Sequence, residues 1–184
     1  MDAVARTRHA RGMSARATLR SATSTRHDAV DAAYGAFVLA EAISYGRFLT
    51  AHARALPAVE KALRACATLP PFAPRTELLR ADLAQLGRPM PDPMPLAPHS
   101  NEAAAFGALY VIEGSRLGGA MLARQVPDTL PRAYLSATHD SGGWRMFWER
   151  LDRAEETGGP GWIDRAIAAA KATFDLYAAA AAAV

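Results

Sequence analysis

The sequence predicts an all-α fold in a single domain, and three observations lead to this prediction. The chain has 184 residues, enough for one hydrophobic core but too few for two full-sized domains. Alanine, the strongest helix former, supplies much of the 51% hydrophobic content. Apolar residues recur at helical spacing, and no segment reads convincingly as a strand. We therefore expect about seven or eight helices.

The first predicted helix begins near Thr18. From there an apolar row follows steps of three and four, and it consists of Leu19, Thr23, His27, Val30 and Tyr34. Residues 1–17 carry several arginines among small residues and lack this period, so we expect a basic, disordered tail. The folded domain is therefore predicted to span residues 18–184.

Prolines and glycines divide the middle of the chain. A second helix is expected over roughly 35–53 and a third over 57–68, with Pro57 in its first turn. A fourth helix begins near Thr76 and stops at Gly87. Residues 88–99 hold five prolines and are predicted to form a loop, because proline disrupts a helix interior.

The helix expected over about 101–125 contains glycine at positions where alanine would be more stable. Each glycine costs up to about 1 kcal/mol, so something must offset about 3–4 kcal/mol. Gly107, Gly114 and Gly118 fall on one side, which leaves bare backbone there. Either another helix packs closely on this side or a flat ligand approaches it. Gly118 and Gly119 also allow a bend without proline.

Two further helices are expected over 144–155 and 161–183. Composition then excludes several classes of protein. The net charge of +3 is modest and forms no dense basic stripe, which argues against nucleic-acid binding. The sequence has no run of eighteen or more apolar residues, so no membrane span is predicted. Cys66 is the single cysteine, so an internal disulfide is excluded, and we expect a cytoplasmic protein.

His27 is the histidine most in need of explanation, because it lies within an apolar row. Two interpretations remain open at this point: a hydrogen-bonded core residue, or a single axial ligand for a haem iron. Arg20 precedes His27 by two helical turns, about 10.5 Å along the axis. That separation suits a guanidinium at the edge of a bound ring, although Arg20 could equally lie at a solvated helix start.

Three segments together resemble the haem oxygenase family. Residues 19–27 (LRSATSTRH) resemble its proximal helix, which ends in the iron-ligating histidine. Residues 109–119 (LYVIEGSRLGG) resemble its kinked distal helix, most closely in the bacterial branch associated with phytochrome operons. Residues 169–174 (AAKATF) resemble its C-terminal helix. The segments occur in family order over nearly the whole chain from residue 18.

The resemblance implies a haem-oxygenase-like bundle that holds haem between the proximal and distal helices. His27 would be the axial ligand, Arg20 and Arg145 would bind the propionates, and Phe174 would reach the distal side. Gly114 and Gly118 would approach the ring, and Gly119 would permit the bend. With Val30 from the proximal row, the implied haem contacts are His27, Arg20, Val30, Gly114, Gly118, Gly119, Arg145 and Phe174.

The resemblance also implies an activity: oxidation of haem, as both cofactor and substrate, to biliverdin, iron and carbon monoxide. Oxygen and reducing equivalents from a reductase or ferredoxin would be needed, and a phytochrome could accept the bilin. A cytoplasmic monomer is expected. Gly114 and Ser115 would serve catalysis, but many family members have an aspartate where this chain has Ser115. That carboxylate orders a water for proton delivery, whereas a serine carries no charge.

Two alternatives to the enzyme stay open. One is a haem-binding or haem-carrying protein on the same scaffold without turnover. The other is a helical protein whose glycine face packs against another helix and binds no haem.

Overall fold

The computed structural model describes residues 14–99 and 101–184, and the predicted tail residues 1–13 lie outside them. Over the described residues the chain forms seven α-helices and one short 3-10 helix, with no strand. In chain order the elements are α1 (Ala15–Gly35), α2 (Ala42–Arg64), α3 (Thr76–Gln85), α4 (Glu102–Leu122), η2 (Ala123–Gln125), α5 (Ala133–Ser136), α6 (Gly143–Thr157) and α7 (Trp162–Ala182). The predicted all-α class is confirmed.

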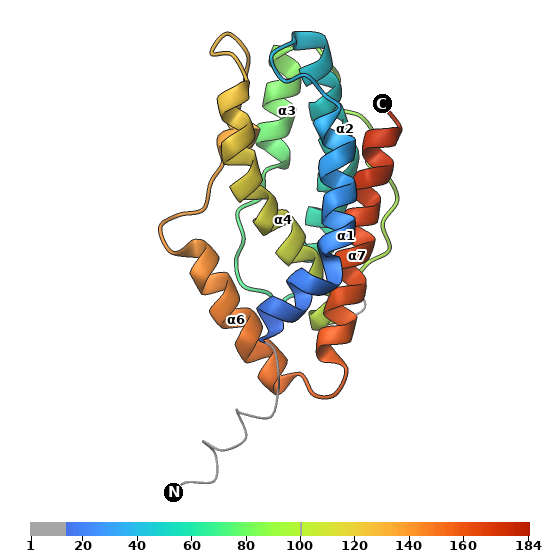
Figure 1. The fold of residues 1–184 in the computed structure, drawn as a ribbon, viewed down its shortest axis with the longest axis vertical. Coiled ribbons are helices and arrows are strands. Elements are labelled where there is room, and N and C mark those ends of the chain that lie inside the picture. Colours follow the sequence, from blue (N-terminus) through green and yellow to red (C-terminus); the bar gives the residue numbers. More distant parts are fainter. Residues whose placement is uncertain (1–13, 100) are drawn as a thin grey trace, which may run out of the picture.

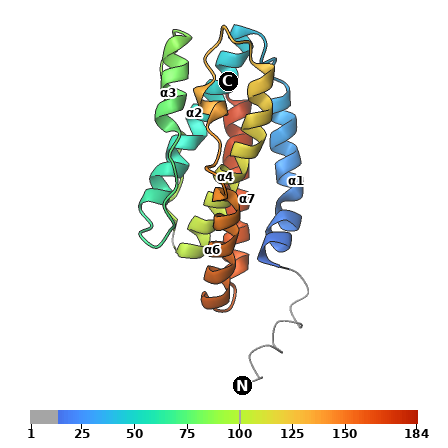
Figure 2. The ribbon, with the colours of Figure 1, turned by 90° about the vertical axis from the view of Figure 1, so that its left-hand side faces the viewer.

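Helix α7 is central to the bundle, because it packs against α1, α2 and α4. Figures 1 and 2 show these helices along the long axis of the molecule. Helix α6 packs against α1 and α4, beside the first turns of α1 (Figure 1). The fully buried core side chains come mainly from α2, α4 and α7, among them Tyr45, Leu49, Leu56, Leu109 and Ala166. None of the described helices combines the length and hydropathy needed to cross a bilayer.

Helix α2 corrects one prediction. The sequence predicts two helices separated before Pro57, whereas the structure has one continuous helix with Pro57 inside it. Proline in a helix interior costs about 3 kcal/mol. The flanking Leu56 and Val59 are both fully buried, and each contributes about 1.5–3 kcal/mol. Burial on both sides of the proline therefore outweighs its local cost.

Helix α1 starts earlier than expected. Ser14 is its N-cap, and the Ser14 side chain accepts a hydrogen bond from the backbone N–H of Ala17 at 3.3 Å. Residues 15–17, which the sequence assigned to the tail, are therefore helical. The shift brings Arg16 into the structured domain, where its guanidinium lies over the ring of Trp148 at 5.3 Å.

Helix α4 agrees closely with its predicted span. Asn101 caps its N-terminus by accepting a hydrogen bond from Ala104 N–H at 2.9 Å. The helix continues through Gly118 and Gly119 to Leu122, and η2 extends it to Gln125. The bend expected at Gly119 stays a prediction.

The glycines of α4 divide into two kinds. A Cβ on Gly107 would overlap the backbone carbonyl of Ala166 in α7, and one on Gly119 would lie 3.1 Å from the carbonyl oxygen of Leu135. By contrast, a Cβ on Gly118 would meet nothing within 4 Å. Close helix packing thus explains Gly107, whereas Gly118 faces open space.

Candidate functional site

The open space beside Gly118 belongs to a cavity of about 640 Å³ between α1 and α4. Side chains from α2, α6 and α7 complete its walls. The volume falls within the range of roughly 300–1,000 Å³ that is typical of small-molecule and cofactor sites. Most of the predicted site residues meet here, namely Arg20, His27, Val30, Gly114, Ser115, Gly118, Gly119 and Phe174.

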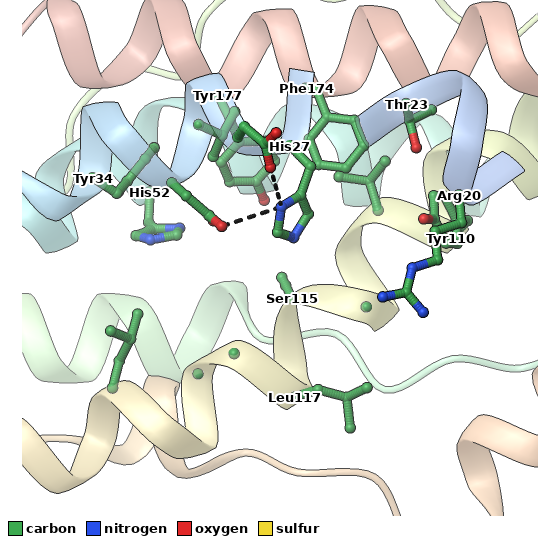
Figure 3. Close-up of a pocket in the computed structure, with 18 of the residues that line it drawn as sticks. Arg20, Thr23, His27, Tyr34, His52, Tyr110, Ser115, Leu117, Phe174 and Tyr177 are labelled. Carbon is green, nitrogen blue, oxygen red and sulfur yellow. Dashed lines mark ion pairs between the residues drawn. The ribbon is translucent and has the colours of Figure 1, made fainter. Parts of the chain in front are cut away.

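His27 enters the cavity from α1. Its Nδ1 lies 3.1 Å from the carboxylate of Asp31, one turn further along the helix, and 3.9 Å from that of Asp28. Figure 3 shows both pairs as dashed lines. With Nδ1–H donating to Asp31, the lone pair of the neutral ring is on Nε2, which is free to bind a metal. Neither Asp28 nor Asp31 was singled out from the sequence for this orienting role.

The glycine-bearing turns of α4 form the opposite wall. In Figure 3, Ser115 and Leu117 mark α4 across the cavity from His27. Gly118 leaves its backbone bare, and a Cβ on Gly114 would be in ordinary contact with Trp144 at 3.7 Å. Over these turns a flat group can approach the helix backbone closely.

We call the end of the cavity that carries Arg16 and Arg20 its outer end, because both side chains are exposed there. Within the described residues no carboxylate pairs with the Arg20 guanidinium. Arg145, expected to be the second basic group, does not line the cavity. It is exposed and pairs with Glu149 at 2.9 Å, one turn along α6. Arg16 lines the cavity together with Arg20, whereas Arg145 lies outside it.

Phe174 lines the cavity as expected but lies on the other side from the one predicted. Its ring centroid is 5.9 Å from that of His27, with the planes inclined at 70°. The two side chains are neighbours in Figure 3. Phe174 thus packs on the His27 side of the cavity, because α7 runs against α1.

Ser115 is held by two hydrogen bonds. Its hydroxyl donates to the carbonyl of Ile112 at 2.7 Å and accepts from the Arg75 guanidinium at 2.7 Å. Arg75 is buried, precedes α3 and also lines the cavity. The single proton of the Ser115 hydroxyl is therefore already used within α4. No pattern in the sequence pointed to Arg75.

The inner end of the cavity, as we call the end away from Arg20, contains His52 (Figure 3), and Tyr134 lines the cavity in contact with it. The Nδ1 atom of His52 is 2.8 Å from the hydroxyl oxygen of Tyr134. Burial, together with the nearby Arg75 charge, lowers the pKa of His52 to about 3. Burial raises the pKa of the Tyr134 hydroxyl. At neutral pH the contact therefore joins an uncharged phenol and an uncharged imidazole. The four-residue step from Phe48 to His52 could have indicated this inward position.

Behind the glycine wall, the Glu113 carboxylate of α4 contacts an arginine and a histidine. One carboxylate oxygen lies 3.0 Å from Arg116 and the other 3.0 Å from His139. Arg116 also donates to the carbonyls of Ala73 and Ala137. This network ties α4 to the loops before α3 and α6. Glu113 is therefore buried within this network and does not face solvent.

A multi-ligand metal centre does not fit the described residues, since no three or more His, Cys, Asp and Glu side chains gather to hold an ion. One histidine facing bare backbone, with basic side chains at the rim, fits a metal that a planar organic group already ligates. The geometry suits a single axial bond.

The fold gives the class of protein. It matches the crystal structure of NO- and CO-bound haem oxygenase from Neisseria meningitidis with a TM-score of 0.76. The match covers 92% of this chain and 91% of that one, at 24% sequence identity. This chain is thus an all-α protein with the haem oxygenase fold.

A partial sequence match points in the same direction. A haem oxygenase from Xanthomonas campestris pv. campestris (strain 8004) is 41% identical over 85 residues, which are 43% of this chain and 51% of that protein. The similarity thus spans about half the length of that relative. No family model matches the chain. The chain is thus similar to haem oxygenases in its fold and, over those 85 residues, in its sequence.

Proposed function

We propose that this chain binds haem in the cavity between α1 and α4 and oxidises it to biliverdin, with release of iron and carbon monoxide. The observation that carries the proposal is one cavity lined by His27, with Nε2 free, and by the bare backbone of Gly118. The haem oxygenase fold and the partial sequence match support the same activity.

The residues present fit haem. Asp31 fixes the His27 ring so that Nε2 carries the lone pair for an axial bond. At the outer end, the exposed guanidinium groups of Arg16 and Arg20 suit the two propionates, because arginine binds carboxylates with parallel hydrogen bonds. Val30 and Phe174 supply apolar contact.

When bound, haem supplies both the iron that activates oxygen and the ring that is cleaved. The chain provides position and environment. Gly118 leaves room for a small diatomic molecule beside α4, where any larger side chain would occupy that space. Aromatic side chains around the cavity, such as Trp144 and Trp148, exclude bulk water.

The binding part of the proposal is tested with hemin. Titration of the protein should give a sharp Soret band, which His27→Ala should lose and added imidazole should restore. Gly114→Leu should bind hemin or oxygen more weakly, because the side chain enters the cavity beside Trp144. An unchanged spectrum in His27→Ala would exclude His27 as the axial ligand.

The catalytic part is tested by turnover. With ascorbate or a reductase under oxygen, the bound haem should disappear and biliverdin should be identified as the product. Haem that is reduced under oxygen yet stays intact would instead support a haem-binding or carrier protein. Ser115 favours keeping this second function as a candidate. Its hydroxyl already donates a hydrogen bond to the carbonyl of Ile112, and it supplies no carboxylate.

The proposed reaction also implies partners. It consumes oxygen and reducing equivalents, so we propose a reductase or ferredoxin as the electron donor. A phytochrome that takes up the bilin is a further candidate, in line with the bacteriophytochrome-associated branch. A monomeric state and a cytoplasmic location stay predictions.

A further inference from the structure

A buried cation faces the cavity without a counter-ion. Arg75 is 2% exposed, and its guanidinium donates to two neutral acceptors, the carbonyl of Ile112 at 2.8 Å and the hydroxyl of Ser115 at 2.7 Å. No carboxylate of residues 14–99 and 101–184 forms an ion pair with it. The carboxylate of Glu60 instead accepts from backbone and hydroxyl groups of Arg75 and Thr76. A charge buried in this way is costly unless an anion joins it.

A second hydrogen-bond donor lines the same cavity. Among the described residues the Tyr134 hydroxyl has His52 Nδ1 as its one hydrogen-bond partner, so we assign the hydroxyl proton to that bond. The neutral imidazole then carries its own proton on Nε2. Nε2 has no partner among the described residues, so its N–H is left for an acceptor in the cavity. Tyr134 therefore fixes the tautomer that turns His52 into a donor.

Tyr134 also links the two donors. The Arg75 guanidinium lies over the Tyr134 ring at 5.1 Å, while the hydroxyl of the same ring holds His52. All three side chains line the cavity. His52 lies at the opposite end of the cavity from Arg20, one of the groups assigned to the propionates (Figure 3).

We propose that Arg75 and His52 bind a small monovalent anion, of the size of azide or fluoride, at the inner end of the cavity. A guanidinium and a neutral imidazole N–H are both donors, and the wall beside them, Ser115, contributes no negative charge. The site is built from this chain alone and needs no haem, but it lies on the wall of the cavity to which haem is assigned. The serine in place of the family's aspartate leaves Arg75 available for the anion.

The test uses the full chain without haem, labelled with 15N, and sodium azide as the probe. The ring resonances of His52 and the guanidinium resonances of Arg75 should shift and saturate. In Arg75→Gln, which keeps an amide donor for Ile112 and Ser115, the affinity for azide should fall about tenfold or more, as expected for a charged hydrogen bond. Absence of a saturable shift in the natural chain would overturn the proposal.

A second variant keeps the proposal testable even if Arg75→Gln does not fold. Ser115→Asp places a carboxylate beside Arg75, so it should pair with the guanidinium and lower the affinity for azide about tenfold. Tyr45→Phe is the matched control, because Tyr45 is buried, donates to the carbonyl of Pro131 and does not line the cavity. Equal affinities in Ser115→Asp and Tyr45→Phe would overturn the proposal. Loss of hemin binding in His27→Ala is measured separately, so the haem and anion proposals fail independently.

Discussion

The imidazole of His27 and the carboxylate of Asp31 are in contact within α1, with Nδ1 and Oδ2 3.1 Å apart. The i, i+4 spacing of a helix brings the two groups together. Because the contact uses Nδ1, it leaves Nε2 for a metal. Asp31 thus affects the bond between His27 Nε2 and a metal without contacting the metal itself.

Replacing Asp31 by asparagine should weaken the proposed axial bond. The carboxylate raises the basicity of the imidazole, and loss of such a partner typically lowers metal affinity by about 10–100-fold. We expect weaker hemin binding and a higher reduction potential of the iron. Asp28→Asn is the control, since Asp28 is 3.9 Å from the same Nδ1. Equal reduction potentials in the two variants would contradict the assigned role.

Alanine at Gly118 and at Gly107 should change stability in opposite directions. Gly118→Ala gains helix propensity in open space, so the free energy of unfolding should rise by about 0.5–1 kcal/mol. Gly107→Ala should lower it by about 1–3 kcal/mol, because the new methyl overlaps the Ala166 carbonyl. Urea denaturation of the haem-free chain measures both. Similar losses at the two positions would show that Gly118 is packed.

Arg20→Ala should reduce hemin affinity about tenfold, the effect of losing one charge-assisted hydrogen bond to a propionate. Arg145→Ala should leave hemin affinity unchanged, because Arg145 pairs with Glu149 outside the cavity. Fluorescence quenching of the nearby tryptophans by hemin gives both values. A larger loss of hemin affinity in Arg145→Ala than in Arg20→Ala would instead identify Arg145 as the propionate partner.

Glu113→Gln should lower the free energy of unfolding by about 3–5 kcal/mol, because Arg116 would be left buried without its counter-charge. The exposed pair of Arg145 and Glu149 provides the control. Glu149→Gln should change stability by less than about 1 kcal/mol. Thermal or urea denaturation distinguishes the two, and comparable small effects would mean that the Glu113 network does not stabilise α4.

The stability of the haem-free chain should depend on His52 below neutral pH. Burial lowers the pKa of His52 from 6.5 to about 3, so below pH 6.5 the unfolded chain binds a proton that the folded chain does not. Stability is therefore fully present above pH 6.5 and falls as the pH drops toward 3, by about 1.4 kcal/mol per unit for one histidine. Between pH 6.5 and 5, before most carboxylates titrate, His52→Gln should show a smaller slope in urea denaturation. The same slope as in the natural chain would contradict the inward position.

Periodicity was sufficient to predict the class and most helices, because the apolar rows of α1, α4 and α7 follow helical spacing. It failed at Pro57, where local propensity favours a break and burial of Leu56 and Val59 favours continuation. Tertiary packing decided that position, and a local pattern carries no information about it.

The residues of the candidate site also fall into those that the sequence could predict and those that it could not. His27, Arg20 and the glycines could be found from motifs, because each lies at a fixed step along one helix. Arg75, however, reaches Ser115 across 40 positions of sequence. The Tyr134 hydroxyl likewise reaches His52 across 82 positions. Such pairs are created by the packing of α2, α3, α4 and α5, so spacing along the chain could not predict them.

The two kinds of glycine in α4 would diverge if this lineage ever lost its ligand. Selection for folding alone would still require glycine at position 107, where the Ala166 carbonyl leaves no room for a methyl group. At Gly118 the same selection would favour alanine, which gains helix propensity in open space. Among descendants of this chain, alanine at position 118 together with an unchanged glycine at 107 would therefore indicate a protein that still folds but no longer binds its ligand.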